Sequence, residues 1–146
     1  MVYHIPALLN ESIEGLNIKP GGTYADVTFG GGGHTREILK HLGDGKLVAF
    51  DQDEDASVNI PDDNRIIFLN QNFRFLKNNL IFNKIESIDG LIADLGVSFH
   101  QFDEPSRGFT FRENAPLDMR MNKNGKSTVI YYSSCNGWKN LGMGNY

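Results

Sequence analysis

The chain of 146 residues is 40% hydrophobic and 22% charged, which predicts one globular domain with its own core. It has no apolar run of membrane-spanning length, no secretory signal pattern, and a single cysteine, Cys135, which permits no intrachain disulfide. We therefore expect a cytoplasmic protein without a membrane partner, and the net charge of −4 excludes nucleic-acid binding by the whole surface.

Residues 1–20 are predicted to form a helix that lies over a sheet or over a cofactor. Pro6 suits the first turn of a helix, and Pro20 followed by two glycines ends the pattern. Apolar side chains recur at roughly helical spacing at Leu8, Leu9, Ile13 and Leu16.

A strand, a glycine turn and a helix follow. Residues 23–29 predict a strand, the four glycines from Gly30 to Gly33 come directly after it, and residues 35–42 show a helical pattern. This arrangement brings a ligand close to backbone N–H groups at a helix N-terminus, and glycine permits the close approach. A flexible glycine loop without a ligand is the alternative.

The next apolar run, residues 46–50, predicts a second strand. It leads into Asp51, about twenty residues after the turn, where a carboxylate can accept hydrogen bonds from ribose hydroxyls. The dinucleotide fingerprint fails because Thr35 or Arg36 stands where its third glycine belongs, and no Gly-Lys-Ser/Thr closes a P-loop. The pattern favours S-adenosylmethionine over ATP or NAD, and a nicotinamide-dependent domain is the disfavoured alternative.

The later elements continue the alternation. Residues 52–63 predict a short acidic helix or turn, and residues 66–69 a third buried strand. Asn72 is a candidate N-cap for a helix over residues 73–82, and residues 91–95 predict a fourth strand that is apolar on both faces. Strands alternating with helices at this spacing predict an α/β fold with a parallel sheet.

Glycine or polar residues, and one aromatic residue, stand at or just after the carboxyl ends of these strands. They are Asp26, the turn Gly30 to Gly33, Asp51, Phe73 and Asp94. Ligands of parallel sheets bind beyond these ends. A single acid there is commonly a helix cap, but four such strand ends predict one shared site.

Six segments carry a resemblance to a known family. They are HIPALL at 4–9, GGGH at 31–34, DQD at 51–53, DGLIADLGVS at 89–98, RGFTF at 107–111 and PLDMRM at 116–121. Over residues 3–122 the chain resembles the bacterial ribosomal RNA small-subunit methyltransferase H family, also called MraW. The resemblance implies a Rossmann-like class I methyltransferase sheet. It also implies S-adenosylmethionine-dependent methylation of the exocyclic N4 of a cytosine in the 16S rRNA decoding region.

The resemblance also implies the site residues. Cofactor contacts fall on Gly32, Gly33, His34, Asp51, Phe73, Asp94 and Gln101. Asp51 is expected at the ribose, Phe73 near the adenine, and Asp94 and Gln101 near the methionine end. As a catalytic role, we expect Asp94 or its loop backbone to accept a hydrogen bond from the cytosine amine and localise its lone pair. No metal is expected, because the four histidines are scattered.

The expected partner is 16S rRNA in the small ribosomal subunit, with an unpaired or flipped cytosine as target. Residues 105–126 are mainly basic, a pattern that suits phosphate contacts, with a solvated loop as the alternative. Phe99, Phe109 and Phe111 are candidates to stack on the base, with packing as the alternative for each. Where the family has Ser-Pro-Gln after Ser98, this chain has Phe-His-Gln ending at Gln101.

The resemblance ends near residue 122. We expect residues 1–122 to be the N-terminal part of a methyltransferase domain and residues 123–146 to be an atypical, out-of-frame tail. Residues 91–95 then become an exposed sheet edge. We expect residues 128–132 to pair on this edge, within one chain or between two chains of a homodimer, with disorder of these residues as the alternative. The alternative function is a module that binds S-adenosylmethionine without turnover.

Overall fold

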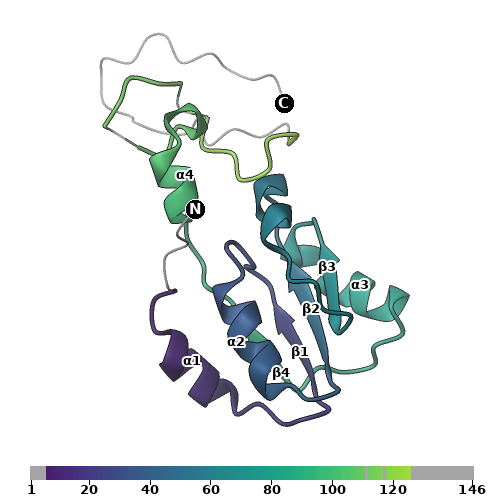
Figure 1. Ribbon diagram of the computed structural model, residues 1–146. Coiled ribbons are helices and arrows are strands. Elements are labelled where there is room, and N and C mark those ends of the chain that lie inside the picture. Colours follow the sequence, from purple (N-terminus) through teal and green to yellow (C-terminus); the bar gives the residue numbers. More distant parts are fainter. Residues whose placement is uncertain (1–5, 111, 117, 126–146) are drawn as a thin grey trace. The chain divides into compact units, whose positions relative to one another are not determined.

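The computed structural model describes residues 6–110, 112–116 and 118–125 (Figure 1). The chain divides into two compact units, residues 1–96 and residues 97–146. The first unit holds a sheet with its helices, and the described part of the second holds two short helices. The predicted division into residues 1–122 and 123–146 stays a prediction.

The sheet of the first unit has four parallel strands in the order β3-β2-β1-β4. Their bounds are Thr23–Asp26 for β1, Lys46–Phe50 for β2, Ile66–Leu69 for β3 and Gly90–Ile92 for β4. In the register, Ala25 lies between Val48 of β2 and Leu91 of β4. The predicted α/β class with a Rossmann-like parallel sheet is confirmed.

One helix precedes β1, and further helical segments connect the strands. They are α1 (Leu9–Leu16), α2 (Gly33–His41), the 3-10 helix η1 (Glu54–Asn59), the 3-10 turn η2 (Phe73–Phe75) and α3 (Leu76–Phe82). The expected N-cap is confirmed, since the Asn72 side chain accepts a hydrogen bond from the Arg74 N–H, but the first turn of the predicted helix is η2. None of the helices in the described part of the chain is long and apolar enough to span a membrane.

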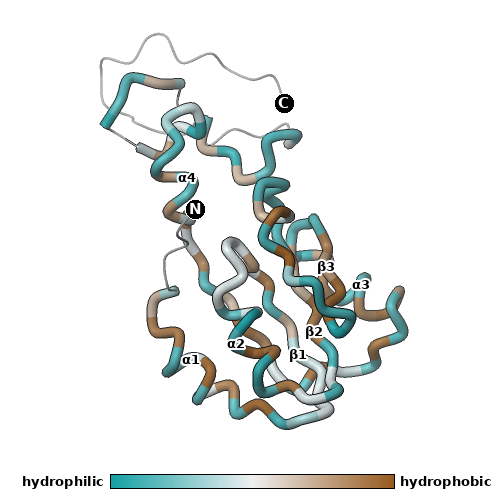
Figure 2. Tube along the Cα trace, viewed as in Figure 1, coloured by the Kyte–Doolittle hydropathy of each residue, from teal (hydrophilic) through white to brown (hydrophobic). Residues whose placement is uncertain are grey.

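Apolar side chains cover both faces of the sheet, as the all-parallel topology requires. On one face, Tyr24 and Leu47 pack with Ile38, Leu39 and Leu42, and on the other, Ala25, Val48 and Phe50 pack with Leu76 and Leu80. The first set belongs to the side of α2, and the second to the side of α3. Figure 2 shows the apolar residues along β2 and β3. Burying each large side chain contributes on the order of 2 kcal/mol, so the sheet is a firm base for the loops at its ends.

Two strands are shorter than predicted. Strand β1 ends at Asp26, where residues 23–29 were expected, and the Asp26 carboxylate accepts the Thr28 N–H at this point. The next residues keep contact with the neighbouring strands, since the Val27 N–H donates to Ile92 of β4 and the Phe29 N–H to Phe50 of β2. Strand β4 ends at Ile92, where residues 91–95 were expected, and the apolar side chains of this stretch are exposed: Leu91 by 44% and Leu95 by 71%. β4 is an edge strand among the described residues. The candidate strand 128–132 lies outside them, so the predicted pairing and homodimer stay predictions.

The N-terminal helix is also shorter than predicted. α1 starts after Leu8 and ends before Asn17, and both of these flanking residues are in the left-handed conformation. Ile13 and Leu16 pack against the core as the stripe predicted, but Leu8 is 70% exposed. Pro6, expected in the first turn, lies before the helix.

Candidate functional site

The strand order places a topological switch point between β1 and β4. From β1 the chain adds β2 and then β3 on one side, and β4 returns to the other side of β1. Ligands of such sheets bind in the crevice beyond the carboxyl ends at this point. The glycine turn follows β1, Asp51 follows β2 and Asp94 follows β4. The topology therefore places these three predicted parts of the site together at the carboxyl ends of the strands.

The glycine turn has a backbone shape that only glycine adopts easily. Gly30 and Gly32 have φ angles of 52° and 74°, in the left-handed region. A Cβ on Gly32 would lie 2.9 Å from the Phe29 ring. Helix α2 starts at Gly33, and no side chain of the described residues caps it at Gly32, so the N–H groups of its first turn can bind a polar or anionic ligand group.

Asp51 is joined directly to this turn. Its Oδ2 accepts a 2.7 Å hydrogen bond from the Gly30 N–H, and its Oδ1 accepts a 2.8 Å bond from the Asp53 N–H. Burial raises the pKa of Asp51, although these backbone bonds oppose the shift. Each carboxylate oxygen has a second lone pair. The group is therefore fixed in place and still able to accept a hydrogen bond from a ribose hydroxyl.

Asp26 is buried beneath the glycine turn, where it binds the residues on either side of the turn, and it does not line the site. It is 0% exposed, and its carboxylate accepts the Thr35 hydroxyl at 2.7 Å and the Thr28 N–H at 3.1 Å. Burial raises the pKa of Asp26, while the nearby charge of His34 lowers it. Because Thr35 belongs to α2 and Thr28 follows β1, this buried carboxylate links the end of the strand to the start of the helix.

His34, in the first turn of α2, carries an unsatisfied nitrogen. Its side chain is buried, and Nε2 has no hydrogen-bond partner within the described residues. Leaving a buried polar atom unpaired costs about 1–3 kcal/mol. A polar group of a ligand at the start of α2 fits this requirement.

Phe73 follows β3 and lies near the end of β2. The Asn70 side chain donates a 2.9 Å hydrogen bond to the Asp51 carbonyl, and the Asn72 side chain donates a 2.9 Å bond to Gln52. These bonds bring the start of η2 to the segment that holds the predicted ribose acid. Phe73 is 42% exposed, so part of its ring is free to contact a flat heterocycle.

Asp94 lies beyond the end of β4 with its side chain exposed. Its backbone N–H donates a 2.7 Å hydrogen bond to the Thr28 hydroxyl. The structure therefore brings Asp94 to the segment between β1 and the glycine turn. Sequence reasoning did not single out Thr28, because no local pattern links residues that are 66 positions apart.

Gln101 belongs to the second unit, where its side chain has a structural task. It is 4% exposed and lies in α4 (Phe99–Asp103). Its Oε1 accepts the Ser98 N–H at 3.0 Å, and its own N–H donates to the Ser98 hydroxyl at 3.2 Å, forming a capping box. The Ser-x-x-Gln spacing could have predicted this box. A cofactor contact of Gln101 stays a prediction.

The basic segment of the second unit is partly internal. Arg107 is 4% exposed and donates to the carbonyls of Arg120 and Met121, and Arg120 pairs with Asp118. Phe109 is 7% exposed, so the packing alternative holds for it. Phe99 is 59% exposed and remains a candidate to stack on a base, and Phe111 lies outside the described residues.

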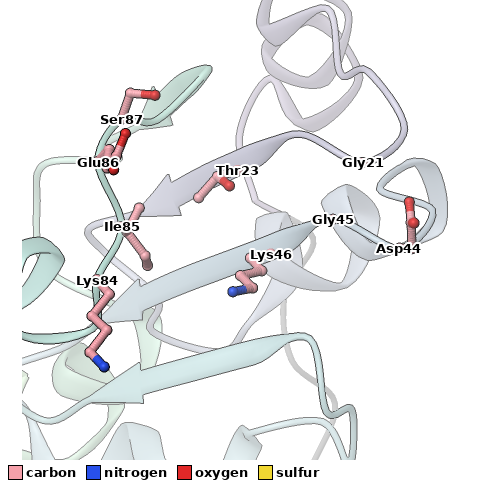
Figure 3. A pocket seen from close by; sticks show the side chains of 9 residues that line it. All are labelled: Gly21, Thr23, Asp44, Gly45, Lys46, Lys84, Ile85, Glu86 and Ser87. Carbon is pink, nitrogen blue, oxygen red and sulfur yellow. The ribbon is translucent and has the colours of Figure 1, made fainter.

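A separate hollow of about 300 Å³ lies at the amino ends of the strands, opposite the glycine turn (Figure 3). It is lined by Gly21, Thr23, Asp44, Gly45, Lys46, Lys84, Ile85, Glu86 and Ser87. Thr23 and Lys46 begin their strands, whereas ligands of parallel sheets bind at the other end. We therefore place the candidate site at the glycine turn. No cluster of three or more metal-ligating side chains is found in the described ranges.

Comparisons with known proteins agree on one family. The profile of the MraW methylase family matches residues 1–133. The chain is 57% identical over 124 residues to a protein of Bacteroides thetaiotaomicron named ribosomal RNA small subunit methyltransferase H, covering 84% of this chain and 41% of that protein. Proteins with the same name from Flavobacterium johnsoniae and Christiangramia forsetii are 59% and 58% identical, with 41% and 42% of their lengths covered.

The chain thus spans about two fifths of the length of these curated relatives. Among solved structures, a putative rRNA-methylase from Clostridium thermocellum is similar with a TM-score of 0.45 at 21% identity, over 51% of this chain and 48% of that chain.

Proposed function

The chain belongs to the MraW methylase family, and from that premise we propose that its glycine turn binds S-adenosylmethionine for the methylation of small-subunit ribosomal RNA. The observation that carries this proposal is the hydrogen bond from the Gly30 N–H to the Asp51 carboxylate. It joins the glycine turn and the ribose-binding acid into one rigid unit. When bound, the cofactor supplies a methyl group activated on a sulfonium.

The charges around the turn support a cationic cofactor. Burial is the main cause of the raised pKa of Asp26 and of Asp51, and a neighbouring carboxylate adds to it in each case: that of Asp51 at Asp26, and that of Asp53 at Asp51. These carboxylates favour a sulfonium cation, while the N–H groups at the start of α2 suit the anionic carboxylate of the same cofactor. Together with the exposed ring of Phe73 and the unpaired Nε2 of His34, the residues present fit an adenosyl sulfonium.

For the substrate, we propose the exocyclic N4 of a cytosine in the 16S rRNA decoding region. This nitrogen is a poor nucleophile because its lone pair is delocalised into the ring. Asp94 lies beyond β4 with its backbone anchored on Thr28, so its exposed carboxylate is positioned to accept a hydrogen bond from the amine. The task of this residue is to orient the amine and localise its lone pair.

Titration calorimetry with S-adenosylmethionine and NAD tests the cofactor. We expect one S-adenosylmethionine per chain and no measurable NAD binding. Asp51→Asn is expected to weaken the affinity about tenfold, the effect of losing one charge-assisted hydrogen bond. Asp62→Asn, a change at an exposed acid away from the turn, is the matched control and should leave affinity unchanged. Preference for NAD, or full affinity in Asp51→Asn, contradicts the proposal.

Transfer of a labelled methyl group to small ribosomal particles separates the enzyme from a module that only binds the cofactor. We expect transfer to a cytosine and its loss in Asp94→Asn with the cofactor affinity retained. Binding without transfer by the parent chain supports the binding-only alternative. An Asp94→Asn variant that keeps both affinity and turnover removes Asp94 from the proposed role.

A further inference from the structure

Two side chains hold the glycine turn by its carbonyl groups. Asn59, at the end of η1, donates from Nδ2 to the Gly30 carbonyl at 3.2 Å. Arg36, in α2, donates from Nη1 to the Gly31 carbonyl at 2.5 Å. Two consecutive glycine carbonyls are thus bound by donors from two elements that lie on either side of β2 in the sequence.

The same two residues also bind each other. Arg36 donates from Nη2 to the Asn59 carbonyl at 2.7 Å. Arg36, Asn59 and the turn therefore close a ring of three hydrogen bonds, which we call the turn clamp. The planar guanidinium makes both of its bonds from one rigid fork, and a lysine ammonium does not reproduce that geometry. Both bonds of Asn59 are partly buried, and the bond from Arg36 to the Gly31 carbonyl is exposed.

The clamp completes the restraint of Gly30. The N–H of Gly30 is bound by Asp51 and its carbonyl by Asn59, so the peptide groups on both sides of this residue are fixed. The Gly32 N–H is bound in turn by the Phe29 carbonyl at 2.7 Å. Glycine has the greatest backbone freedom of any residue, so a turn of four glycines pays the largest entropy cost for ordering on binding.

We propose that Arg36 and Asn59 are positioning residues, which keep the glycine turn in its ligand-binding shape before the cofactor arrives. The clamp acts through the turn, and by removing the ordering cost it raises affinity without adding a contact to the ligand. The identity of the ligand rests on the proposed function, but the shape of the free turn does not.

The test combines amide hydrogen exchange of the free chain with cofactor calorimetry. In Arg36→Lys and in Asn59→Ala, we expect the Gly30 and Gly32 amides to exchange about tenfold faster without ligand. The dissociation constant for S-adenosylmethionine should rise about fivefold in each variant, and the double variant should show much less than the product of the two effects.

Arg65 provides the matched control, because it also donates to two backbone carbonyls, those of Leu39 and Gly43, away from the turn. Arg65→Lys should lower the melting temperature and leave the turn amides and the affinity unchanged. If Arg65→Lys weakens binding as much as Arg36→Lys does, the effect is one of global stability and the clamp is refuted. Unchanged exchange at Gly30 and Gly32 in Arg36→Lys also refutes it.

The two proposals fail separately. If the parent chain does not bind S-adenosylmethionine but Arg36→Lys loosens the turn amides, the clamp stands and the proposed cofactor falls. If the cofactor binds and Arg36→Lys changes neither exchange nor affinity, the cofactor assignment stands and the clamp falls.

Discussion

The Thr28 hydroxyl accepts a 2.7 Å hydrogen bond from the Asp94 N–H, and this bond crosses the switch point between β1 and β4. The Thr28 N–H in turn donates to the Asp26 carboxylate, which also accepts the hydroxyl of Thr35 in α2. A continuous chain of hydrogen bonds therefore runs from the first turn of α2 to the loop after β4. It links the part of the site proposed for the cofactor to the part proposed for the cytosine.

Thr28→Val tests this link, because valine keeps the shape of threonine and removes the acceptor. The Asp94 N–H then loses its partner, at a cost of about 1–2 kcal/mol. We expect faster exchange of the Asp94 amide and a fall in methyl transfer of about tenfold, with cofactor affinity changed less than threefold. Thr23→Val, at the opposite end of β1, is the control and should leave transfer unchanged. Equal losses in affinity and transfer would show that the bond merely stabilises the fold.

The buried carboxylate of Asp26 makes stability depend on pH in a defined sense. Its pKa is raised by burial above the ordinary value of 3.8, so the folded chain binds this proton more tightly than the unfolded chain does. The contribution to stability is fully present below pH 3.8 and is lost as pH rises through the folded pKa.

The Asp26→Asn variant removes this titration. Urea unfolding of the variant and the parent at several pH values isolates the contribution of Asp26 to the pH dependence of stability. The exposed acids contribute equally to this pH dependence in the two proteins. We expect the free energy of unfolding of the variant, relative to the parent, to increase as pH rises from about 4 to 7. A relative stability that falls over this range contradicts the raised pKa.

Hydrophobic patterns in the sequence predicted the positions of β2 and β3 correctly. They did not predict the residue at which β1 ends, because a side-chain hydrogen bond lies at that point. The strands predicted at residues 46–50 and 66–69 match β2 and β3 in their bounds. β2 is buried beyond its first residue, but β3, which was predicted to be buried, is a half-buried edge strand among the described residues. At the end of β1 the side chain of Asp26 binds the Thr28 N–H, and no period of two residues encodes that bond.

In the candidate site, too, local sequence features were predictable, whereas hydrogen bonds between residues far apart in the sequence were not. Glycine chemistry and spacing predicted the turn and Asp51 as separate features, but not the hydrogen bond that joins them. The clamp residues Arg36 and Asn59 are 23 positions apart and contact the turn only after η1 has folded beside it. Composition suggested that Arg107 is exposed for RNA, whereas backbone carbonyls hold its guanidinium in the interior.

The two roles of Gln101 can be separated with Ser98. Ser98→Ala and Gln101→Ala each remove one bond of the capping box, and each should destabilise α4 by about 1 kcal/mol. If Gln101 also contacts the cofactor, only Gln101→Ala weakens the binding of S-adenosylmethionine, and we expect this result. Calorimetry on both variants, with their stabilities from urea unfolding, makes the comparison. Equal affinities in the two variants would limit Gln101 to its capping role.

The effect of Gly33→Ala on stability is expected to change sign when Pro6 is also replaced. Its φ is not in the left-handed region, so the helix itself accepts alanine there, and glycine-to-alanine changes in helices are worth about 1 kcal/mol in stability. A Cβ on Gly33 would, however, lie 2.6 Å from Cδ of Pro6, and the proline ring has no flexible end to move aside.

We therefore expect Gly33→Ala to destabilise the parent by about 1–3 kcal/mol through overpacking against the proline ring. In a Pro6→Ala background the same change should become neutral or stabilising, because the obstructing ring is gone. Gly32→Ala should destabilise in both backgrounds, since its φ of 74° strains any residue with a Cβ. Urea unfolding of this set of variants measures the coupling. An unchanged cost of Gly33→Ala without Pro6 would show that the glycine is required for the backbone and not for the contact.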